Sequence, residues 1–300
     1  MRGALAPALV LLAALLLAAC SGGRTRPAHA DWHGRAAAPG TSERFRDDLS
    51  RPQSSRYRDG SDSVPEGPPP DISKLPEPVP RVEPRSLYGN KSPYTVLGKT
   101  YRVLPTARGY DERGIASFYG NKFHGYKTSS LENYDMYAFS AASKTLPLPS
   151  YARVTNLQNG KSVIVRVNDR GPFVAGRLID LSYAAAVKIG IWPKGTGLVE
   201  VRGIDPSQPS AELPPPPAVT AGQPGIYLQV GAFSDVDNAE RVASRLREAH
   251  FAPVQVIEAE VNGHRVRRVR VGPLNDVESA DRVSARIEQM GLPRPQVAVD

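Results

Sequence analysis

The chain has 300 residues, a formal net charge of +8 and 40% hydrophobic residues, which is enough for two modest domains with compact cores. Its single cysteine excludes an intrachain disulfide framework. The positive charge favours an anionic polymer or surface as partner, either nucleic acid or an acidic cell-wall polymer, and indicates nothing about the fold.

The first residues predict export from the cytoplasm. MRGALAPALVLLAALLLAAC contains one arginine, a continuous apolar run and then small residues, the pattern of a secretory signal peptide over residues 1–19. The run is too short for a stable membrane span. It ends in Leu17-Ala18-Ala19-Cys20, which resembles a bacterial lipobox. We therefore expect cleavage before Cys20 and a lipid anchor on this residue, with a chance cysteine beside an ordinary cleavage site as the alternative.

Residues 20–85 are polar and charged, with few apolar clusters and a series of prolines between Pro65 and Pro84. Such a composition cannot bury enough apolar surface to offset the entropy of ordering, and the prolines stiffen the chain. The segment is therefore predicted to be a lipidated, disordered tether that gives the rest of the protein reach from the membrane.

The amino-acid composition changes at Ser86, where short segments rich in β-branched and aromatic residues begin. Four of them are predicted strands, at Gly114–Gly120, Ala152–Leu157, Ser162–Asp169 and Gly197–Ile204. Asn159-Gly160 lies between the second and third and is a strong signal for a hairpin turn. Many short strands in one segment predict a small all-β barrel over residues 86–205.

One helix is predicted within this barrel, over Ile179–Gly190. Ser182 is a suitable N-cap, and Gly190 is a suitable residue just past the helix end.

A proline-rich linker is predicted over residues 206–224, where Pro214 to Pro217 are consecutive. The segment 225–300 then repeats one pattern, because VGAFSDVDNAERVASRLREAHF is echoed by VGPLNDVESADRVSARIEQMGL. Each copy contains a strand followed by an amphipathic helix, and Asn262-Gly263 predicts a hairpin between them. The expected order is βαββαβ, a small α+β module with one sheet.

Several motifs resemble those of the rare lipoprotein A family of septal cell-wall proteins. They are GIASFYG, FHGYKT, the stretch from Tyr134 to Phe173 and RLIDLSYAAA, within residues 86–204. The resemblance implies a double-psi β-barrel for this segment and a SPOR module, which binds peptidoglycan, for the C-terminal segment. It further implies an endolytic lytic transglycosylase that cuts the MurNAc-β-1,4-GlcNAc bond of strands stripped of stem peptides and leaves a 1,6-anhydro end.

Glycan cleavage needs a carboxylic acid to protonate the leaving oxygen and a second group to stabilise the developing positive charge. With the sugar's own C6 hydroxyl as nucleophile, no metal or other cofactor is required. The candidate acids are Glu132, Asp135 and Asp169, and Asp169 ends a predicted strand, at a position where barrels commonly build sites. Taken alone, Asp169 could equally cap the following turn and the other two could be solvated loop acids. The resemblance implies functional roles for Glu132 and Asp169, and for Asp135 as a third acid.

Ser143 departs from the family pattern, in which active members usually have histidine at this position. Serine offers a hydrogen bond but does not titrate near neutrality as histidine does. Two functions therefore stay open, an active lytic transglycosylase and a catalytically weak peptidoglycan-binding lipoprotein, with a hydrolase that uses water as a third.

In the C-terminal module the resemblance implies that Gln229, Phe233 and Arg268 contact glycan. The period of a strand places Arg268 and Arg270 on one face and Arg267 on the other. A solvated edge strand protected by its charges is the alternative.

The expected location is the periplasmic side of the outer membrane, at the division septum. The expected partners are denuded peptidoglycan, the membrane through Cys20, and candidate division proteins. The export signal argues against nucleic acid.

Overall fold

The computed structural model describes residues 47–51, 53–57, 59–69, 71–208, 224–251, 253–261 and 263–299. The predicted signal peptide, Cys20, the first part of the predicted tether and most of the predicted linker lie outside these ranges. None of the helices within them has the length and apolar character needed to cross a membrane.

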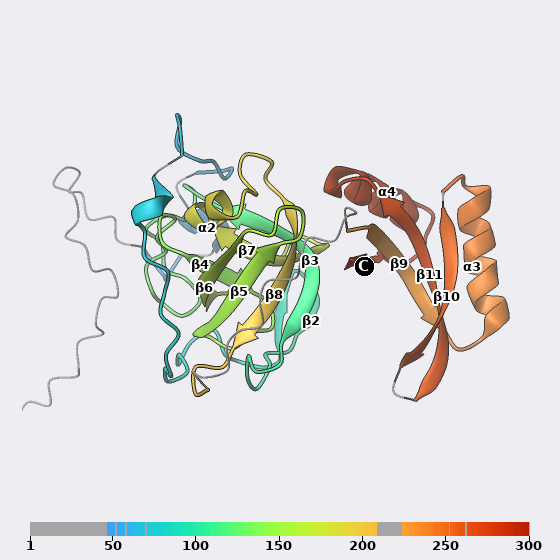
Figure 1. Ribbon diagram of the computed structural model, residues 1–300, viewed down its shortest axis with the longest axis horizontal. Coiled ribbons are helices and arrows are strands. Elements are labelled where there is room, and N and C mark those ends of the chain that lie inside the picture. Colours follow the sequence, from blue (N-terminus) through green and yellow to red (C-terminus); the bar gives the residue numbers. More distant parts are fainter. Residues whose placement is uncertain are drawn as a thin grey trace, which may run out of the picture. The chain divides into compact units, whose positions relative to one another are not determined.

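Six strands close into a barrel in the order β3-β7-β4-β6-β5-β8 (Figure 1). Their bounds are β3 Asp111–Tyr119, β4 Ser140–Ser143, β5 Ser150–Asn156, β6 Ser162–Asp169, β7 Arg177–Ser182 and β8 Gly197–Ile204. The pairs β3/β7 and β4/β6 are parallel and the other neighbours are antiparallel. This mixed, closed arrangement confirms the predicted double-psi β-barrel.

The barrel core follows from the alternation predicted for β6. Val163, Val165 and Val167 are at most 1% exposed and pack in one apolar cluster with residues of the other strands. The predicted hairpin between β5 and β6 is also present, and Gly160 adopts φ +70°, a conformation that glycine reaches without a Cβ penalty.

The helix differs from its prediction at its start. Helix α2 spans only Tyr183–Lys188, while Ile179–Leu181 belong to β7. The predicted N-cap is confirmed, because the Ser182 hydroxyl accepts hydrogen bonds from the backbone N–H of Ala185 and of Ser140, both at 3.3 Å. Gly190 follows the helix with φ +74°.

Replacing Ser182 by alanine is expected to lower the free energy of unfolding by about 1–2 kcal/mol, because the Ala185 N–H loses its acceptor and the Ser140 N–H keeps only the Ala138 carbonyl. Urea unfolding of the full chain measures the change. Ser182→Thr keeps an acceptor oxygen, and a loss for Ser182→Thr equal to that for Ser182→Ala would contradict the capping account.

The segment before the barrel corrects the prediction of a disordered tether up to Arg85. It contains α1 (Gln53–Arg56) and the 3₁₀ helix η1 (Ile72–Lys74). Ile72 and Leu75 pack against the barrel core, and the Glu77 carboxylate accepts a hydrogen bond from the backbone N–H of Ile164 at 3.0 Å. Its acids and few apolar residues therefore bind the barrel, which a composition rule does not detect. A two-stranded hairpin, β1 (Tyr94–Val96) and β2 (Lys99–Tyr101), follows.

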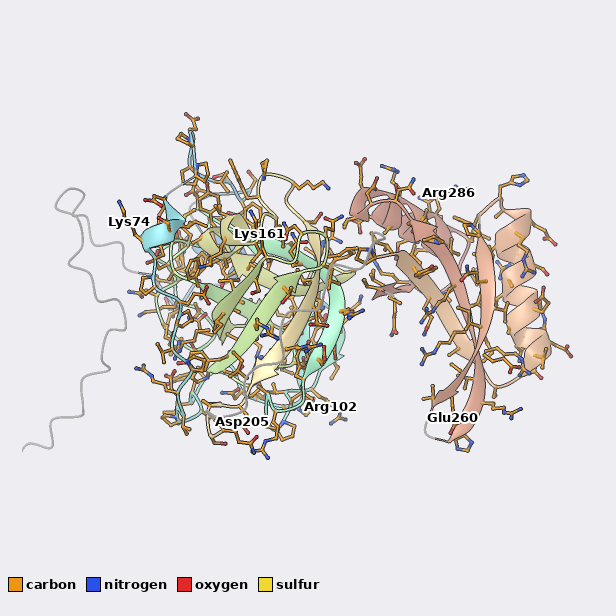
Figure 2. All side chains as sticks on the ribbon, in the orientation of Figure 1. Lys74, Arg102, Lys161, Asp205, Glu260 and Arg286 are labelled. Carbon is orange, nitrogen blue, oxygen red and sulfur yellow. The ribbon has the colours of Figure 1, made fainter. Side chains whose placement is uncertain are left out.

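The C-terminal module has the predicted βαββαβ order, and its four strands pair antiparallel in the order β10-β11-β9-β12. Its elements are β9 Ile226–Phe233, α3 Val236–Glu248, β10 Val254–Val261, β11 His264–Leu274, α4 Val277–Gln289 and β12 Gln296–Val299. The repeat is structural, since Asp235 and Asp276 cap α3 and α4 in the same way, each accepting from the N–H three residues later. Charged side chains such as Glu260 and Arg286 point outward from the module, as Lys161 does from the barrel (Figure 2).

Candidate active site

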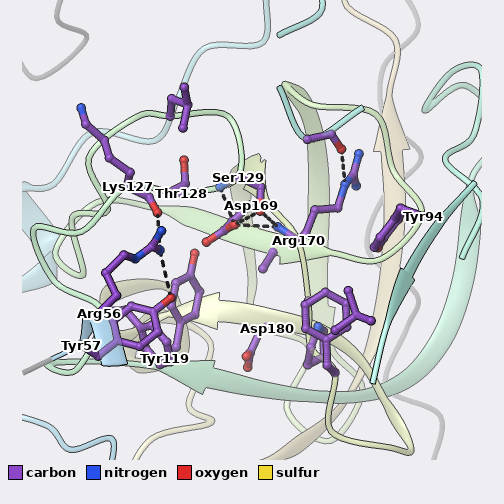
Figure 3. Close-up of a pocket in the computed structure, with 18 of the residues that line it drawn as sticks. Arg56, Tyr57, Tyr94, Tyr119, Lys127, Thr128, Ser129, Asp169, Arg170 and Asp180 are labelled. Atoms are coloured by element: carbon purple, nitrogen blue, oxygen red, sulfur yellow. Dashed lines mark hydrogen bonds between the residues drawn. The ribbon is translucent and has the colours of Figure 1, made fainter. Parts of the chain in front are cut away.

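A cavity of about 660 Å³ opens beside the end of β6 and contains Asp169 and Asp180 among its lining residues (Figure 3). Aromatic side chains of Tyr94, Tyr119 and Phe123 also line it. A hollow that combines aromatic walls with two enclosed carboxylates is the usual form of a binding or catalytic site.

Asp169 is held rigidly at the end of β6. Its Oδ1 accepts hydrogen bonds from the Ser129 N–H at 2.8 Å, the Ser129 hydroxyl at 2.6 Å and the Arg170 N–H at 2.7 Å. Burial raises the pKa of Asp169, and these hydrogen bonds partly oppose the rise because they favour the charged form. Asp169 is therefore an oriented carboxylate with one oxygen fully engaged.

Asp180, on β7, is a site residue that the sequence analysis missed. Burial raises its pKa to about 6, the neighbouring carboxylates of Asp62 and Asp169 add to the rise, and a hydrogen bond with Ser117 opposes it. Its Oδ1 is buried and accepts no hydrogen bond from any described residue. A carboxyl group poised near neutrality is suited to proton transfer.

Strand β4 brings the two carboxylates together. Ala142 is the register partner of Asp169 on one side and of Asp180 on the other. Two strand spacings place the Cα atoms of the two acids roughly 10 Å apart. Because Ala142 also lines the cavity and has only a methyl group, the space between the acids stays open.

Tyr119 lies beside both acids, and its hydroxyl is buried next to the Ser140 side chain. Its ring stacks on Tyr134 with centroids 4.1 Å apart. Burial raises the pKa of Tyr119, and the nearby charges of Asp169 and Asp180 raise it further. The group therefore stays a neutral hydroxyl at the wall of the cavity.

Arg170 fixes the wall opposite Tyr119. Its guanidinium donates to the backbone oxygens of Gly89 at 2.7 Å, Ser143 at 3.0 Å and Leu146 at 2.5 Å, and it lies 5.8 Å from the Tyr94 ring centroid. Burial lowers the pKa of Arg170 to about 10, so it remains charged at neutral pH. Its role is to tie the β1–β2 side of the cavity to β4.

Glu132 is not among the cavity-lining residues. Its Oε2 accepts hydrogen bonds from Arg166 at 2.5 Å and from the Asn168 amide at 2.9 Å. Arg166 is 6% exposed and also binds both carboxylate oxygens of Glu83. The Glu132 carbonyl accepts from the Thr128 N–H, which closes the loop that carries Ser129. Glu132 is thus linked to Asp169 through this loop.

Asp135 lies outside the cavity lining as well. Its Oδ1 accepts from the Tyr137 N–H at 2.9 Å and lies 3.8 Å from the His124 Nδ1. The His124 Nδ1 already accepts from the Met136 N–H at 3.2 Å. Asp135 therefore shapes the turn that leads into β4.

Ser143 ends β4 and is 2% exposed. Its hydroxyl accepts from the N–H groups of Thr145 at 3.3 Å and Leu146 at 3.1 Å. The side chain does not line the cavity, so the serine stabilises the loop after β4.

The three residues expected to bind glycan in the C-terminal module do not share one face of its sheet. Gln229 pairs with Arg270, whose face also carries Arg268. A register shift between Val269 and Arg270 then makes Phe233 the partner of Arg267, and Phe233 packs against the module's apolar core. The irregularity is not visible in the period-two pattern, which assumes an unbroken ladder.

Comparison with known proteins connects these features to a family. A family model described as lytic transglycolase matches residues 111–202, and a SPOR domain model matches residues 222–298. The endolytic peptidoglycan transglycosylase RlpA of Pseudomonas aeruginosa (strain UCBPP-PA14) is 40% identical over 313 residues, covering 86% of each chain.

The descriptions of two further matches contain the same name, RlpA. The protein of the same name from Vibrio cholerae is 43% identical over 211 residues, covering 70% of this chain and 78% of the relative. The crystal structure of the RlpA SPOR domain from Pseudomonas aeruginosa matches with 34% identity and a TM-score of 0.24, covering 25% of this chain and 97% of that chain. Because a relative with 40% identity is matched over 86% of both chains, this chain belongs to the RlpA family of endolytic peptidoglycan transglycosylases.

Proposed function

We propose that this protein is a lytic transglycosylase that cleaves stem-peptide-free peptidoglycan strands, and that Asp169 and Asp180 carry out the reaction. The observation that carries the proposal is the pair of enclosed carboxylates flanking Ala142 in one cavity. The names and sequence similarity of the relatives support the reaction class.

Asp180 is the group best suited to act as the acid. With a pKa of about 6, it keeps its proton in roughly a tenth of the molecules at pH 7. It donates this proton to the glycosidic oxygen as the bond from that oxygen to C1 of MurNAc breaks. The Asp169 carboxylate stabilises the positive charge that develops at C1.

The second half of the reaction returns the proton. The C6 hydroxyl of the same MurNAc attacks C1, and the Asp180 carboxylate, now acting as a base, accepts the hydroxyl proton. One C–O bond has broken and another has formed, so the products are a 1,6-anhydro end and a free C4 hydroxyl. No water is consumed.

Glu132 acts in this proposal by positioning Asp169. Its carboxylate bonds to Arg166 and Asn168 hold the loop that presents Ser129, and its backbone carbonyl closes that loop by accepting from the Thr128 N–H; Ser129 donates two hydrogen bonds to Asp169. The loss of Glu132 is therefore expected to lower the rate less than the loss of Asp169.

The proposed cellular location of the protein rests on the expected lipid anchor at Cys20 and on the C-terminal SPOR module. A lipid on Cys20 would hold the protein at the outer membrane, and the SPOR module would concentrate it on denuded septal glycan through the face that carries Gln229, Arg268 and Arg270. Two weak contacts joined by a linker raise the effective concentration of the barrel at its substrate.

The substrate proposal is tested by digesting two glycan preparations, one stripped of stem peptides and one retaining them, with full-length protein in detergent. Mass spectrometry of the fragments is expected to show 1,6-anhydro ends from the stripped strands only. Equal cleavage of both preparations would contradict the strand preference. Reducing ends without anhydro products would indicate a hydrolase, and intact strands that retain the protein would indicate a binding lipoprotein.

The pH dependence of cleavage is a further prediction. Because the acid must be protonated, kcat/KM is expected to fall as the pH rises through about 6, the pKa of Asp180. The titratable and charged groups around Asp180 are those of Asp62, Asp169, Arg177, Lys144, Tyr119 and Tyr134, and Ser117 is its hydrogen-bond partner. Initial rates between about pH 5 and about pH 8 measure the profile. A flat profile over this range would exclude Asp180 as the acid.

A further inference from the structure

A segment outside both matched family regions forms part of the cavity wall. We name the described residues between Asp47 and Val64 the strap, which lies within the segment expected from its composition to be a free tether. Leu49, Arg56 and Tyr57 of the strap line the same cavity as Asp169 and Asp180.

The strap is attached at both ends by carboxylates that accept backbone hydrogen bonds from one barrel loop. Asp47 accepts from the Lys127 N–H at 2.8 Å. At the other end, Asp62 accepts from the N–H groups of Gly120 at 2.8 Å and Lys122 at 3.1 Å.

Gly120 is shaped for this contact. A Cβ atom at Gly120 would lie 2.2 Å from the Ser63 carbonyl oxygen, a distance that backbone atoms cannot accommodate without moving. The same carbonyl accepts from the Asn121 N–H at 2.9 Å. The strap can therefore pack this closely against the barrel only because position 120 is a glycine, which has no side chain.

The side chains that the strap presents are held in place. Tyr57 packs edge-to-face on Phe123 and Tyr126, with ring centroids 4.9 Å and 5.0 Å away. Arg56 donates to the Tyr57 hydroxyl at 3.2 Å and pairs with Asp47 at 3.3 Å. Figure 3 shows Arg56, Tyr57 and Lys127 on one side of the cavity, with Asp169 and Arg170 beyond them.

We propose that the strap is a glycan-binding wall of the active site, in which Tyr57 and Arg56 contact sugar residues next to the scissile bond. This inference rests on the proposed function. An aromatic ring suits the C–H face of a pyranose, while a guanidinium suits its hydroxyl groups. The lactyl carboxylate that is free on a stripped MurNAc is an anion, and Lys127 supplies positive charge on this wall, while the charge of Arg56 is balanced by its ion pair with Asp47.

Two observations favour a glycan-binding role for the strap over a purely structural one. Leu49 is 49% exposed although it lines the cavity, so an apolar surface is left open where a sugar ring or an acetamido methyl group would pack. The strap also reaches the reacting groups, since the Asp62 carboxylate is close enough to raise the pKa of Asp180.

The kinetic test compares Tyr57→Ala and Arg56→Ala with the controls Tyr88→Ala and Arg51→Ala, which replace exposed residues that do not line the cavity. In full-length protein, loss of a substrate contact outside the reacting centre is expected to raise KM for stripped strands by about tenfold with kcat little changed. The controls are expected to match the wild type. A fall in kcat at constant KM would indicate that the strap has only a structural role. A rise in kcat/KM would indicate that the strap inhibits access to the site. Either result would overturn the proposal.

A second measurement does not depend on cleavage. In the Asp169→Asn variant, amide hydrogen exchange of peptides from residues 47–64 is followed with and without stripped strands. Slower exchange in the strap when glycan is added is expected, and unchanged or faster exchange would overturn the proposal even if the wild type proved inactive. If the strap is protected but the wild type makes no anhydro products, the proposed reaction fails and the binding wall stands.

Discussion

Replacing Asp180 by asparagine is expected to abolish cleavage and, at about pH 7.5, to make the protein more stable. The folded state raises the pKa of Asp180 from 3.8 to about 6 because the group is buried. A shift of about two units means that the ionised carboxylate destabilises the folded protein by up to about 3 kcal/mol above pH 6. Asparagine has the same shape without the charge, so that penalty disappears.

The sign of this effect depends on pH. At about pH 2.5, well below the ordinary pKa of 3.8, the carboxyl group is protonated in the folded and in the unfolded chain, so the asparagine variant is expected to gain nothing there. Urea unfolding at the two pH values, together with initial rates, measures both effects. Asp71→Asn is the control, because this exposed aspartate caps η1 and asparagine can cap equally well. A variant that loses activity and is also less stable at about pH 7.5 would show that Asp180 is a structural group.

Replacing Arg166 by methionine is expected to cause the largest loss of stability in the barrel. Arg166 is 6% exposed and binds Glu132 and Glu83. Its removal leaves Glu132 without its cation and leaves the partly buried Glu83 with only the exposed Arg81 at 3.6 Å, and breaking such a buried pair typically costs about 3–5 kcal/mol. The rate of cleavage is expected to fall as well, since Glu132 then no longer holds the Ser129 loop.

Restoring the charge balance separates these effects. The triple variant Arg166→Met, Glu83→Gln, Glu132→Gln is expected to recover most of the lost stability, because neither carboxylate is left charged without Arg166 and the one remaining charge of the cluster, on Arg81, is exposed to solvent. Arg113→Met is the control, since Arg113 is more exposed and its partner Glu200 keeps a second arginine, Arg202. A loss for Arg113→Met as large as that for Arg166→Met would show that burial of the ion pair is not the cause.

Local patterns predicted the elements that depend on neighbouring residues. Short sequence patterns predicted the buried valines of β6, the hairpin at Gly160 and the Ser182 cap, and the structure contains all three. The boundary between β7 and α2 was wrong, because the barrel pairs Ile179–Leu181 with β4 and β3, a tertiary contact that the helix pattern cannot show. Strand β4 was missed because four small residues carry little periodic signal.

The site was predictable only in part. Asp169 could be found from its position at a strand end, whereas Asp180 acquires its environment through the pairing of β7 with β4, which is fixed by the closed barrel. Its signal in the sequence was the lone acid in the apolar stretch LIDLS, since an unpaired acid in a buried strand needs an explanation. The strap could not be predicted, because the residues that attach it use carboxylates and backbone groups and not an apolar pattern.

The carboxylates flanking Ala142 are proposed to perform the cleavage. The most direct test counts 1,6-anhydro ends per enzyme molecule after digestion of stripped glycan strands by the wild type, Asp169→Asn, Asp180→Asn and Glu132→Gln, all confirmed as folded. We expect anhydro ends from the wild type, a loss of about 1,000-fold or more for each aspartate variant, and a smaller loss for Glu132→Gln. Wild-type yields from either aspartate variant would contradict this proposal.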